Sequence, residues 1–393
     1  MDFPRSWTDP DLDQWRDTCV RFIETELQPD DAAARERGHV GHEVWRKAGA
    51  LGLLCADIPE QWGGAGGDFR HEAVFYEECA RRALSGMATS VHAIVAHYFL
   101  NHGTDDQKRS YLPRMARGEL VGAIAMTEPG AGSDLQGIRS RAERVAGGTG
   151  GQGGQGGQGD HYLINGAKTF ITNGFLAGVV LVVCKTDPAQ GARGTSILIV
   201  ETEACAGFRV GRLLDKMGMH AQDTSELFFD DVRVPAANLL GGKEGQGFYQ
   251  LMGDLPYERL IIGVSALANM EGAYQATLDY VRERKVFGKP LIEMQNTRFK
   301  LAEVATQIKV GRAFIDRCVH ELVAGTLDTA TASMAKLWGS ETQGRVLDEC
   351  LQLFGGYGYM NEDPIARMYT DARVQRIFGG TSEIMKEVIA RQL

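Results

Sequence analysis

The tetrapeptide Tyr257–Leu260 (YERL) contains the side chain best suited to removing a proton from a substrate. Glu258 precedes an apolar stretch that predicts a helix, and a carboxylate among apolar neighbours has a pKa that desolvation can raise. The same carboxylate could instead pair with Arg259 or stabilise a helix N terminus. Spacing alone favours that structural role over a general base.

The segment Met126–Asp134 (MTEPGAGSD) is typical of a loop that holds a polar ligand. Thr127 and Ser133 supply hydroxyls, and the two glycines between them let the backbone approach a ligand closely. Such a loop suits a polar planar ring or a phosphate. It has neither the GK[ST] ending of a P-loop nor the GxGxxG spacing of a dinucleotide fold.

A second segment, Lys168–Gly174 (KTFITNG), reads as part of a strand. Phe170 and Thr172 are two residues apart, so in a regular strand they lie on one face. A ring and a hydroxyl on one face could flank a flavin. An ordinary half-buried strand is the alternative.

Three glycine-containing segments in the last third could lie against an elongated ligand. They are Arg282–Gly288 (RERKVFG), Leu353–Tyr359 (LFGGYGY) and Arg376–Glu383 (RIFGGTSE). Each could equally be a turn that caps a helix.

The elements that carry these segments follow a helical, β, helical order. Apolar residues recur at helical spacing up to about Leu120, with a first helix that Pro29 is expected to end. Short β-rich runs between 164 and 229, separated by turn residues, predict a small antiparallel β domain. From Gly247 onward, four long helices would form a bundle. We therefore expect domains at 1–121, 122–236 and 237–393, with a flexible glycine- and glutamine-rich loop at 147–159.

Composition excludes several classes of protein. The 393 residues carry a net charge of −9, which disfavours nucleic acid and anionic membranes as partners. No apolar run is long enough for a membrane span, and Met1–Arg16 lacks the features of a targeting peptide. The seven cysteines are scattered without a CxxC pair, which indicates reduced thiols in a cytoplasmic protein and no metal site.

Taken together and in this order, the motifs resemble the acyl-CoA dehydrogenase family over nearly the whole chain. The resemblance rests on MTEPGAGSD, KTFITNG, RERKVFGKPL, LQLFGGYGY and IFGGTSEIMKEVIARQL. It implies a mainly α fold with a central β domain: an N-terminal helical domain, a middle β-barrel domain and a C-terminal four-helix bundle. It also implies an FAD cofactor, a homotetramer with the dimer as the minimum unit, and an electron-transfer flavoprotein as the usual acceptor.

The resemblance also assigns roles to individual positions. Met126, Thr127 and Ser133 match residues that line the flavin and the thioester, and Phe170 and Thr172 match the aromatic and the hydroxyl beside the flavin ring. Four positions match residues that hold the adenosine diphosphate part of FAD from a neighbouring subunit: Arg284, Phe287, Gln352 and Gly356. Thr381 and Glu383 match the loop on the FAD side of the bundle. Arg259 and Gly380 match positions that bind the substrate.

The position of the base departs from the commoner pattern of the family. Many members carry a glutamate directly before the Gly-Thr of the last motif, where this chain has Gly379. A branch that includes long-chain and isovaleryl-CoA dehydrogenases has its base on the helix containing ERL, where this chain has Glu258. One carboxylate is lost and another is present, so the resemblance reverses the preference and assigns the base to Glu258.

The implied reaction converts an acyl-CoA thioester to the trans-2-enoyl thioester. Glu258 takes the α-proton, the β-hydrogen passes as hydride to flavin N5, and the backbone N–H of Gly379 helps to stabilise the thioester oxygen. An oxidase, or a dehydrogenase acting on acyl-carrier-protein thioesters, are the alternatives on the same fold. The motifs leave the acyl chain length open.

Overall fold

The computed structural model describes residues 3–147 and 159–393. The predicted loop at 147–159 therefore lies, apart from its two end residues, outside the described residues. The strands on either side of it, β2 (Arg141–Val145) and β3 (His161–Thr172), pair antiparallel.

The N-terminal part is helical. It contains α1 (Pro10–Phe22), α2 (Gln28–Arg37), α3 (His42–Ala50), α4 (Phe69–Arg81), α5 (Thr89–His102) and α6 (Asp105–Ala116). The expectation that Pro29 ends the first helix was wrong. A π-helical turn at Ile23–Leu27 joins α1 to α2, and Pro29 lies in the first turn of α2. The wider turn accommodates a residue without an N–H, so the chain stays helical through the proline.

The middle part is one curled seven-stranded sheet with the order β1-β4-β2-β3-β7-β6, in which β5 pairs with β4. Its remaining strands are β1 (Val121–Ala125), β4 (Ala177–Lys185), β5 (Thr195–Glu201), β6 (Phe208–Leu213) and β7 (Thr224–Pro235). The predicted strands are present, but the sheet is mixed because β1 runs parallel to β4. Asn165-Gly166, a pair of residues typical of turns, lies inside β3 at a register shift.

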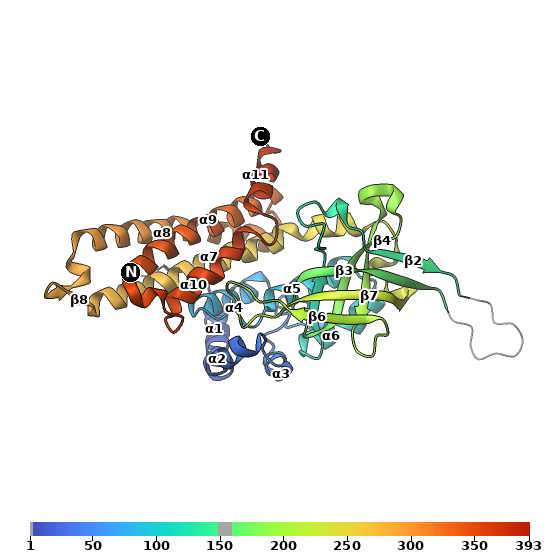
Figure 1. Ribbon diagram of the computed structural model, residues 1–393, viewed down its shortest axis with the longest axis horizontal. Coiled ribbons are helices and arrows are strands. Elements are labelled where there is room, and N and C mark those ends of the chain that lie inside the picture. The colour runs from blue at the N-terminus through green and yellow to red at the C-terminus, as the bar shows by residue number, and fades with distance from the viewer. Residues whose placement is uncertain (1–2, 148–158) are drawn as a thin grey trace, which may run out of the picture.

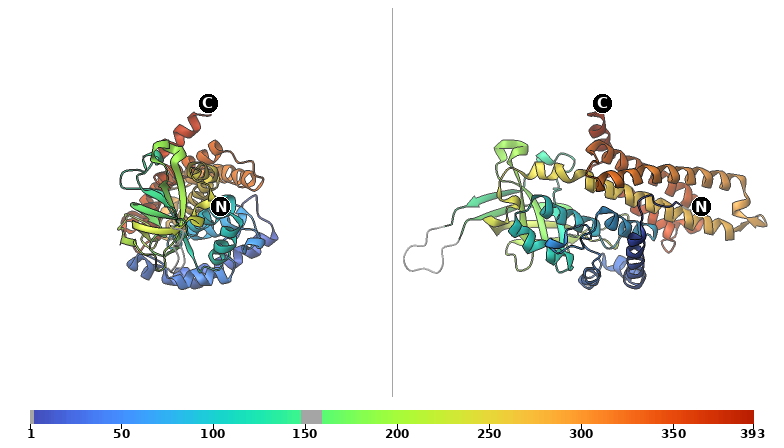
Figure 2. Two further views of the ribbon diagram at one scale, coloured as in Figure 1. Left: turned by 90° about the vertical axis from the view of Figure 1, so that its right-hand side faces the viewer. Right: turned by 180° about the vertical axis from the view of Figure 1, so that it is seen from behind.

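The C-terminal part is a bundle of helices that extends away from the sheet (Figure 1). Three long helices, α7 (Gly247–Glu283), α8 (Gln295–Val323) and α9 (Thr329–Phe354), run side by side. The fourth, α10 (Pro364–Ala372), packs on α7 and α9 and has only nine residues, so the expectation of four long helices was only partly correct. The last helix, α11 (Ser382–Ala390), projects from the bundle in both views (Figures 1 and 2).

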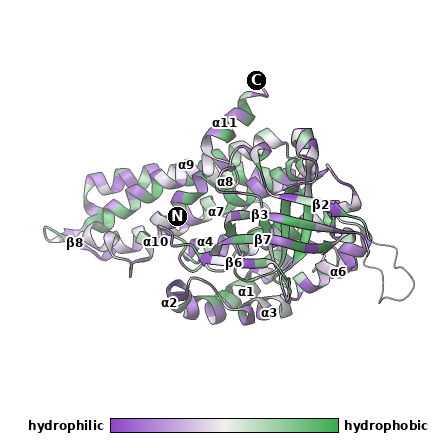
Figure 3. Ribbon diagram, turned by 45° about the vertical axis from the view of Figure 1, so that its right-hand side comes forward, coloured by the Kyte–Doolittle hydropathy of each residue, from purple (hydrophilic) through white to green (hydrophobic). Residues whose placement is uncertain are grey.

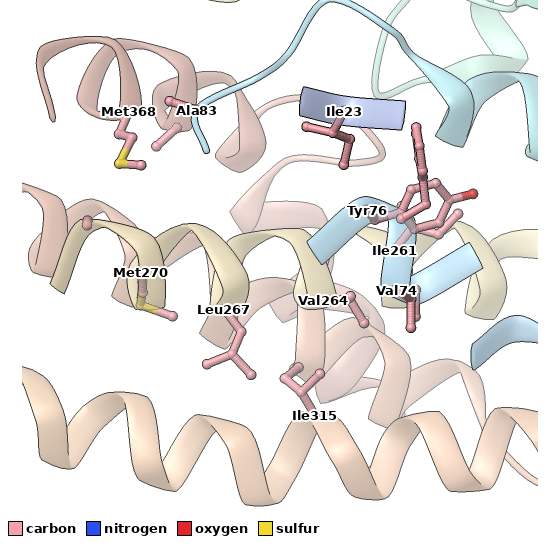
Figure 4. Packing of buried hydrophobic residues seen from close by; sticks show 14 of the residues in the cluster. Ile23, Val74, Tyr76, Ala83, Ile261, Val264, Leu267, Met270, Ile315 and Met368 are labelled. Atoms are coloured by element: carbon pink, nitrogen blue, oxygen red, sulfur yellow. The ribbon is translucent and has the colours of Figure 1, made fainter. Parts of the chain in front are cut away.

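Helix α7 connects all three parts of the molecule. Its Ile261, Val264 and Leu267 pack in one core with residues of α4 and α8 (Figure 4). The sheet has its own apolar interior, visible as hydrophobic strands in Figure 3. Beside the shared core, Arg312 of α8 is buried and bonded to Glu77 of α4 (2.7 Å) and Glu271 of α7 (2.6 Å). A partner removed from such a pair leaves an uncompensated buried charge, so the network fixes α4 against the bundle.

Within the described ranges, no helix is both long and apolar enough to cross a membrane.

Candidate active site

Glu258 lies in the first half of α7 and is buried. The Tyr98 hydroxyl on α5 donates a hydrogen bond of 3.1 Å to Glu258 Oε1. Burial raises the pKa of Glu258 to about 7; the Tyr98 hydrogen bond opposes that rise, and the negative charge of Asp254 adds to it. A carboxylate with a pKa near neutrality can both accept and release a proton at physiological pH.

Helix α5 also fixes the residue one turn before the glutamate. Asp254 accepts hydrogen bonds from Asn101 Nδ2 (2.6 Å), and its second oxygen lies 2.9 Å from His102 Nε2. The α5–α7 contact therefore sets the position of both carboxylates. Sequence reasoning missed Tyr98 and Asp254, because a tyrosine within a largely apolar helix gives no signal of its distant partner.

Two histidines of α5, His92 and His97, have structural contacts. His92 is fully buried, accepts from the Gly122 N–H at Nδ1 (3.1 Å) and lies 3.2 Å from the Met115 carbonyl at Nε2. His97 Nε2 lies 2.9 Å from Asp57 Oδ2, and its ring stacks on Tyr257. Neither forms a hydrogen bond with Glu258.

Gly379 and Gly380 are brought next to the helix that carries Glu258. Both have left-handed backbone angles, with φ of 60° and 92°. A Cβ at Gly379 would stand 2.7 Å from Ile262 Cδ1, one turn after Glu258, so a side chain there would require Ile262 to move and would be strained by the positive φ. The Gly380 carbonyl accepts a hydrogen bond from Lys336 of α9. Within the described residues, no oxygen accepts a hydrogen bond from the N–H of Gly379 or Gly380.

Arg259 is buried on the same part of α7 and faces α9. Its Nη1 donates to Ser333 Oγ (2.9 Å), and its Nε has no acceptor among the described residues. Burial lowers the pKa of Arg259, and the charge of Glu258 opposes that effect. An unpaired buried donor is costly, which suits a position that meets a ligand.

Hydrogen bonds join the glycine-rich segment Met126–Asp134 to the strand segment Lys168–Gly174. The Thr169 N–H donates to the Thr127 carbonyl (2.9 Å), and Lys168 Nζ donates to the Met126 carbonyl (3.0 Å) and to Glu128 Oε1 (2.8 Å). Lys168 is fully buried, so this ion pair fixes the loop on the sheet. Both charged residues lie inside the quoted motifs, but their pairing is visible only in the fold.

One side of the loop Met126–Asp134 is open to a ligand. A Cβ at Gly130 or Gly132 would meet no atom within 4 Å, and Ser133 beside them is exposed. Met126 and Thr127 are half-buried at the base of the loop. Backbone without side chains beside an exposed hydroxyl gives a ligand room to approach.

Phe170 has a strained backbone and an exposed ring. Its φ is 59°, at a register shift between β3 and β7, and its side chain is 66% exposed. Ile171 after it is buried in the sheet interior, and Thr172 is half-buried. A left-handed aromatic residue costs about 1–3 kcal/mol, and such strain is concentrated at ligand sites.

The fit of a flavin to these residues can be judged from the loop and strand together. An exposed aromatic ring, a neighbouring hydroxyl and an open glycine loop are held against each other by buried hydrogen bonds. A planar polar ring system needs this combination of an apolar face and edge donors. The residues present therefore fit a flavin.

Four predicted cofactor residues lie elsewhere, at the far end of the bundle. Arg284 ends α7, 26 positions after Glu258, which corresponds to about 39 Å along the helix. The Arg284 guanidinium lies 5.9 Å from the ring of Tyr357. This contact brings the hairpin that contains Phe287 near the loop that contains Gly356. Gly356 itself follows Gln352 by about one helical turn. Phe287 is 98% exposed with a φ of 49°. The structure groups these four but separates them from Glu258.

Thr381 and Glu383 lie at the start of α11. The Thr381 hydroxyl caps the helix by accepting from the Ile384 N–H (3.3 Å), and Glu383 is exposed in the first turn. The last motif is thus a helix start, and its glycines form the loop that meets α7.

A helical domain, a curled sheet and a helical bundle carry a buried carboxylate and an open loop-and-strand surface that fits a flavin, features that suit a flavin-dependent dehydrogenase. Family models agree along the chain: the acyl-CoA dehydrogenase N-terminal domain matches residues 9–119, the middle domain 123–232 and the C-terminal domain 245–393. The chain belongs to the acyl-CoA dehydrogenase family. It is an oxidoreductase, a flavoenzyme that dehydrogenates acyl-CoA.

Individual relatives agree with that assignment. The long-chain specific acyl-CoA dehydrogenase, mitochondrial, of Mus musculus is 48% identical over 384 residues, covering 97% of this chain and 86% of the relative. A crystal structure of acyl-CoA dehydrogenase from Geobacillus kaustophilus is 43% identical with a TM-score of 0.91 and covers 99% of both chains. An acyl-CoA dehydrogenase from Bacillus anthracis, complexed with FAD, is 30% identical with a TM-score of 0.87 over 98% of this chain and 67% of that one.

Proposed function

We propose that this chain binds FAD and oxidises an acyl-CoA thioester to its trans-2-enoyl form, with Glu258 as the base that removes the α-proton. The observation that carries the proposal is the environment of Glu258, which is buried, bonded to Tyr98 and has a pKa raised to about 7. Position 379, where another carboxylate could act, is a glycine with a positive φ, and the other carboxylate on this part of α7, Asp254, is bonded to Asn101 and His102. Both observations support Glu258 as the base.

The residues around the base divide the remaining work. The free N–H of Gly379 would donate to the thioester oxygen, which makes the α-hydrogen more acidic and lowers the barrier to its removal. Arg259 and Gly380 lie beside Gly379 and would contact the substrate. Ser133 lies on the open side of the other loop, Met126–Asp134. Bound FAD supplies a hydride acceptor at N5 for the β-hydrogen.

We further propose which residues hold the flavin. Met126, Thr127 and Ser133 would line one edge of the ring system, with Phe170 against its face and Thr172 near its polar edge. Thr381 and Glu383 would approach from the start of α11. The open glycines and the exposed, strained Phe170 support this assignment.

We propose that a second copy of the chain completes each flavin site. Arg284 lies about 39 Å along α7 from the base, and its guanidinium lies near Tyr357 in the loop that contains Gly356, so this end of the bundle is too far from the base for one flavin to span within a single chain. The exposed Phe287 and Tyr357 at that end of the bundle are typical of an interface. A dimer is then the minimum active unit and a tetramer the expected assembly.

We also propose a division of the chain after residues 121 and 236, which the limits of the sheet at Val121 and Pro235 support. An electron-transfer flavoprotein would reoxidise the enzyme between turnovers.

The reaction is tested by anaerobic bleaching of the flavin, near about 450 nm, across a panel of acyl-CoAs of different chain length and branching. We expect one class of thioester to bleach the flavin and to lose two hydrogens, as measured by mass spectrometry of the product. Failure of every acyl-CoA would reject the proposal. Rapid reoxidation by air would assign the oxidase alternative instead.

The assembly is tested with Arg284→Ala, and with Arg282→Ala as the matched control from the same segment. We expect Arg284→Ala to lose flavin while the control keeps it, with light scattering reporting a dimer or larger species for the loaded protein. A flavin-loaded, active monomer would contradict the shared site.

A further inference from the structure

Two buried cationic side chains lie beside the loop Phe378–Thr381. Lys336 of α9 is fully buried, donates to the Gly380 carbonyl, and has its Cε 3.6 Å from the place where a Cβ of Gly379 would stand. Arg259 of α7 is 4% exposed and donates to Ser333, one turn before Lys336 on α9. Both cations therefore face the same loop from two helices.

Neither cation forms a salt bridge with a carboxylate in the described part of the chain. Their hydrogen-bond acceptors are a neutral hydroxyl and a backbone carbonyl. Burial, and after it the positive charge of Arg259, lower the pKa of Lys336 to about 8. Unpaired buried charge is costly to keep, so its retention at this point calls for a functional reason.

The groups that face Lys336 can be named element by element. From α7 comes Arg259, whereas Glu258 beside it in the chain is bonded to Tyr98 of α5. From α9 itself come the neutral Ser333 and Ser340, and the loop presents its backbone. Glu341, the nearest carboxylate along α9, accepts instead from Ser382 and lies 3.6 Å from Arg376.

The loop depends on Lys336 for its conformation. Gly379 and Gly380 both have positive φ, a state that glycine enters and leaves easily. Lys336 donates to the Gly380 carbonyl, while the Phe378 N–H bonds backward to Val374 and the Thr381 carbonyl bonds forward to Met385. Lys336 therefore anchors the loop at the peptide that follows Gly380, two peptide units after the Gly379 N–H.

We propose that Lys336 is a positioning residue that aims the Gly379 N–H at the thioester oxygen and places positive charge beside that oxygen. The inference rests on the proposed dehydrogenation. When Glu258 takes the α-proton, the C–H electron pair moves toward the carbonyl, and negative charge builds on the thioester oxygen. Arg259 and Lys336 lie on the side of the loop where that charge forms, in a dry environment that strengthens their effect.

The test compares Lys336→Met, Lys336→Gln and the matched control Lys309→Met, an exposed lysine on α8. Thermal unfolding is measured with and without flavin, and single-turnover flavin reduction is measured at saturating acyl-CoA. Lys336→Met should unfold at a higher temperature than the wild type, because a desolvated charge is removed. Its flavin reduction should nevertheless be about 10- to 100-fold slower, since an oriented oxyanion donor is lost. Lys309→Met should change neither quantity.

Two further readouts separate positioning from a structural role. Lys336→Gln keeps a donor for the Gly380 carbonyl without the charge, so its rate should lie between those of Lys336→Met and the wild type. The rate of wild-type reduction should fall as pH rises through about 8, where Lys336 loses its proton. That alkaline fall should be absent from Lys336→Met.

The inference is overturned if Lys336→Met reduces its flavin as fast as the wild type. It is also overturned if the slower rate is accompanied by a lower unfolding temperature, or if Lys336→Gln is no faster than Lys336→Met. If no acyl-CoA reduces the wild-type flavin, the proposed function fails first and the inference falls with it. If acyl-CoA reduces the flavin of the wild type and of Lys336→Met at the same rate, only the inference is rejected and the proposed function stands.

Discussion

Replacing Tyr98 by phenylalanine should raise the pKa of the proposed base and slow the enzyme at low pH. The Tyr98 hydroxyl donates to Glu258 Oε1 at 3.1 Å, and this hydrogen bond favours the ionised carboxylate. A hydrogen bond to a charged group contributes about 1.5–3 kcal/mol, which at 1.36 kcal/mol per unit corresponds to about 1–2 pKa units. The pKa of Glu258, about 7 in the structure, should therefore rise to about 8–9.

The base must be ionised to accept the α-proton, so the rate of flavin reduction increases with pH on the acid side of its profile. Below pH 7 the ionised fraction changes tenfold per pKa unit. Tyr98→Phe should thus reduce its flavin about 10- to 100-fold more slowly than the wild type in that range. The assay is single-turnover reduction by stopped flow from pH 5.5 upward, with acyl-CoA at saturation.

Tyr111→Phe provides a matched control, because the Tyr111 hydroxyl donates to Glu201 at 3.2 Å in a similar tyrosine–glutamate contact away from the site. The control should keep the wild-type profile. An unchanged or lowered pKa in Tyr98→Phe, or an equal shift in the control, would refute the reasoning.

Three other perturbations test separate parts of the structure. Glu258→Gln should raise the free energy of unfolding at pH 8 by up to about 3 kcal/mol and change it little at pH 5. The native pKa of about 7 lies above the ordinary 4.5, so the wild type loses stability as the pH rises between these two values. Denaturant unfolding at the two pH values measures the difference, and an equal gain at both would argue against it. Gly379→Glu should restore less flavin reduction to Glu258→Gln than the same change combined with Ile262→Ala, because the new side chain needs Ile262 to move and the positive φ strains it in both variants; stopped flow follows the rates, and equal restoration would show that Ile262 does not hinder the position. Lys168→Met should lower the free energy of unfolding by about 3–5 kcal/mol and release flavin, because it leaves Glu128 buried and unpaired; calorimetry and flavin content measure both, and full stability would exclude a buried ion pair there.

Much of the fold could be predicted from the sequence because its signals are local. Helical periodicity and turn residues identified the helical, β, helical order, and the family resemblance supplied the arrangement. The failures came from tertiary context. A π-helical turn carries the first helix through Pro29, and β1 pairs parallel with β4, which no local pattern of alternation reveals.

The site was predictable only in part, for a similar reason. Alternation predicts Phe170 and Thr172 on one side of β3, but the pattern gave no indication of the left-handed φ of Phe170 or of the register shift there. Tyr98 and Lys336 are far from Glu258 and Gly380 in the chain, and their side chains look like ordinary members of helices. Such contacts depend on helix packing, so a single sequence gives no signal for them.

The most direct test of Glu258 as the base is anaerobic single-turnover reduction of Glu258→Gln by the acyl-CoA that the wild type oxidises. The substituted enzyme should retain flavin and bind the thioester, seen as a perturbed flavin spectrum, because glutamine keeps the volume and the hydrogen bond to Tyr98. Its flavin reduction should be slower by about 10²–10⁴-fold, the usual contribution of a general base. Reduction within tenfold of the wild-type rate would show that another group removes the α-proton.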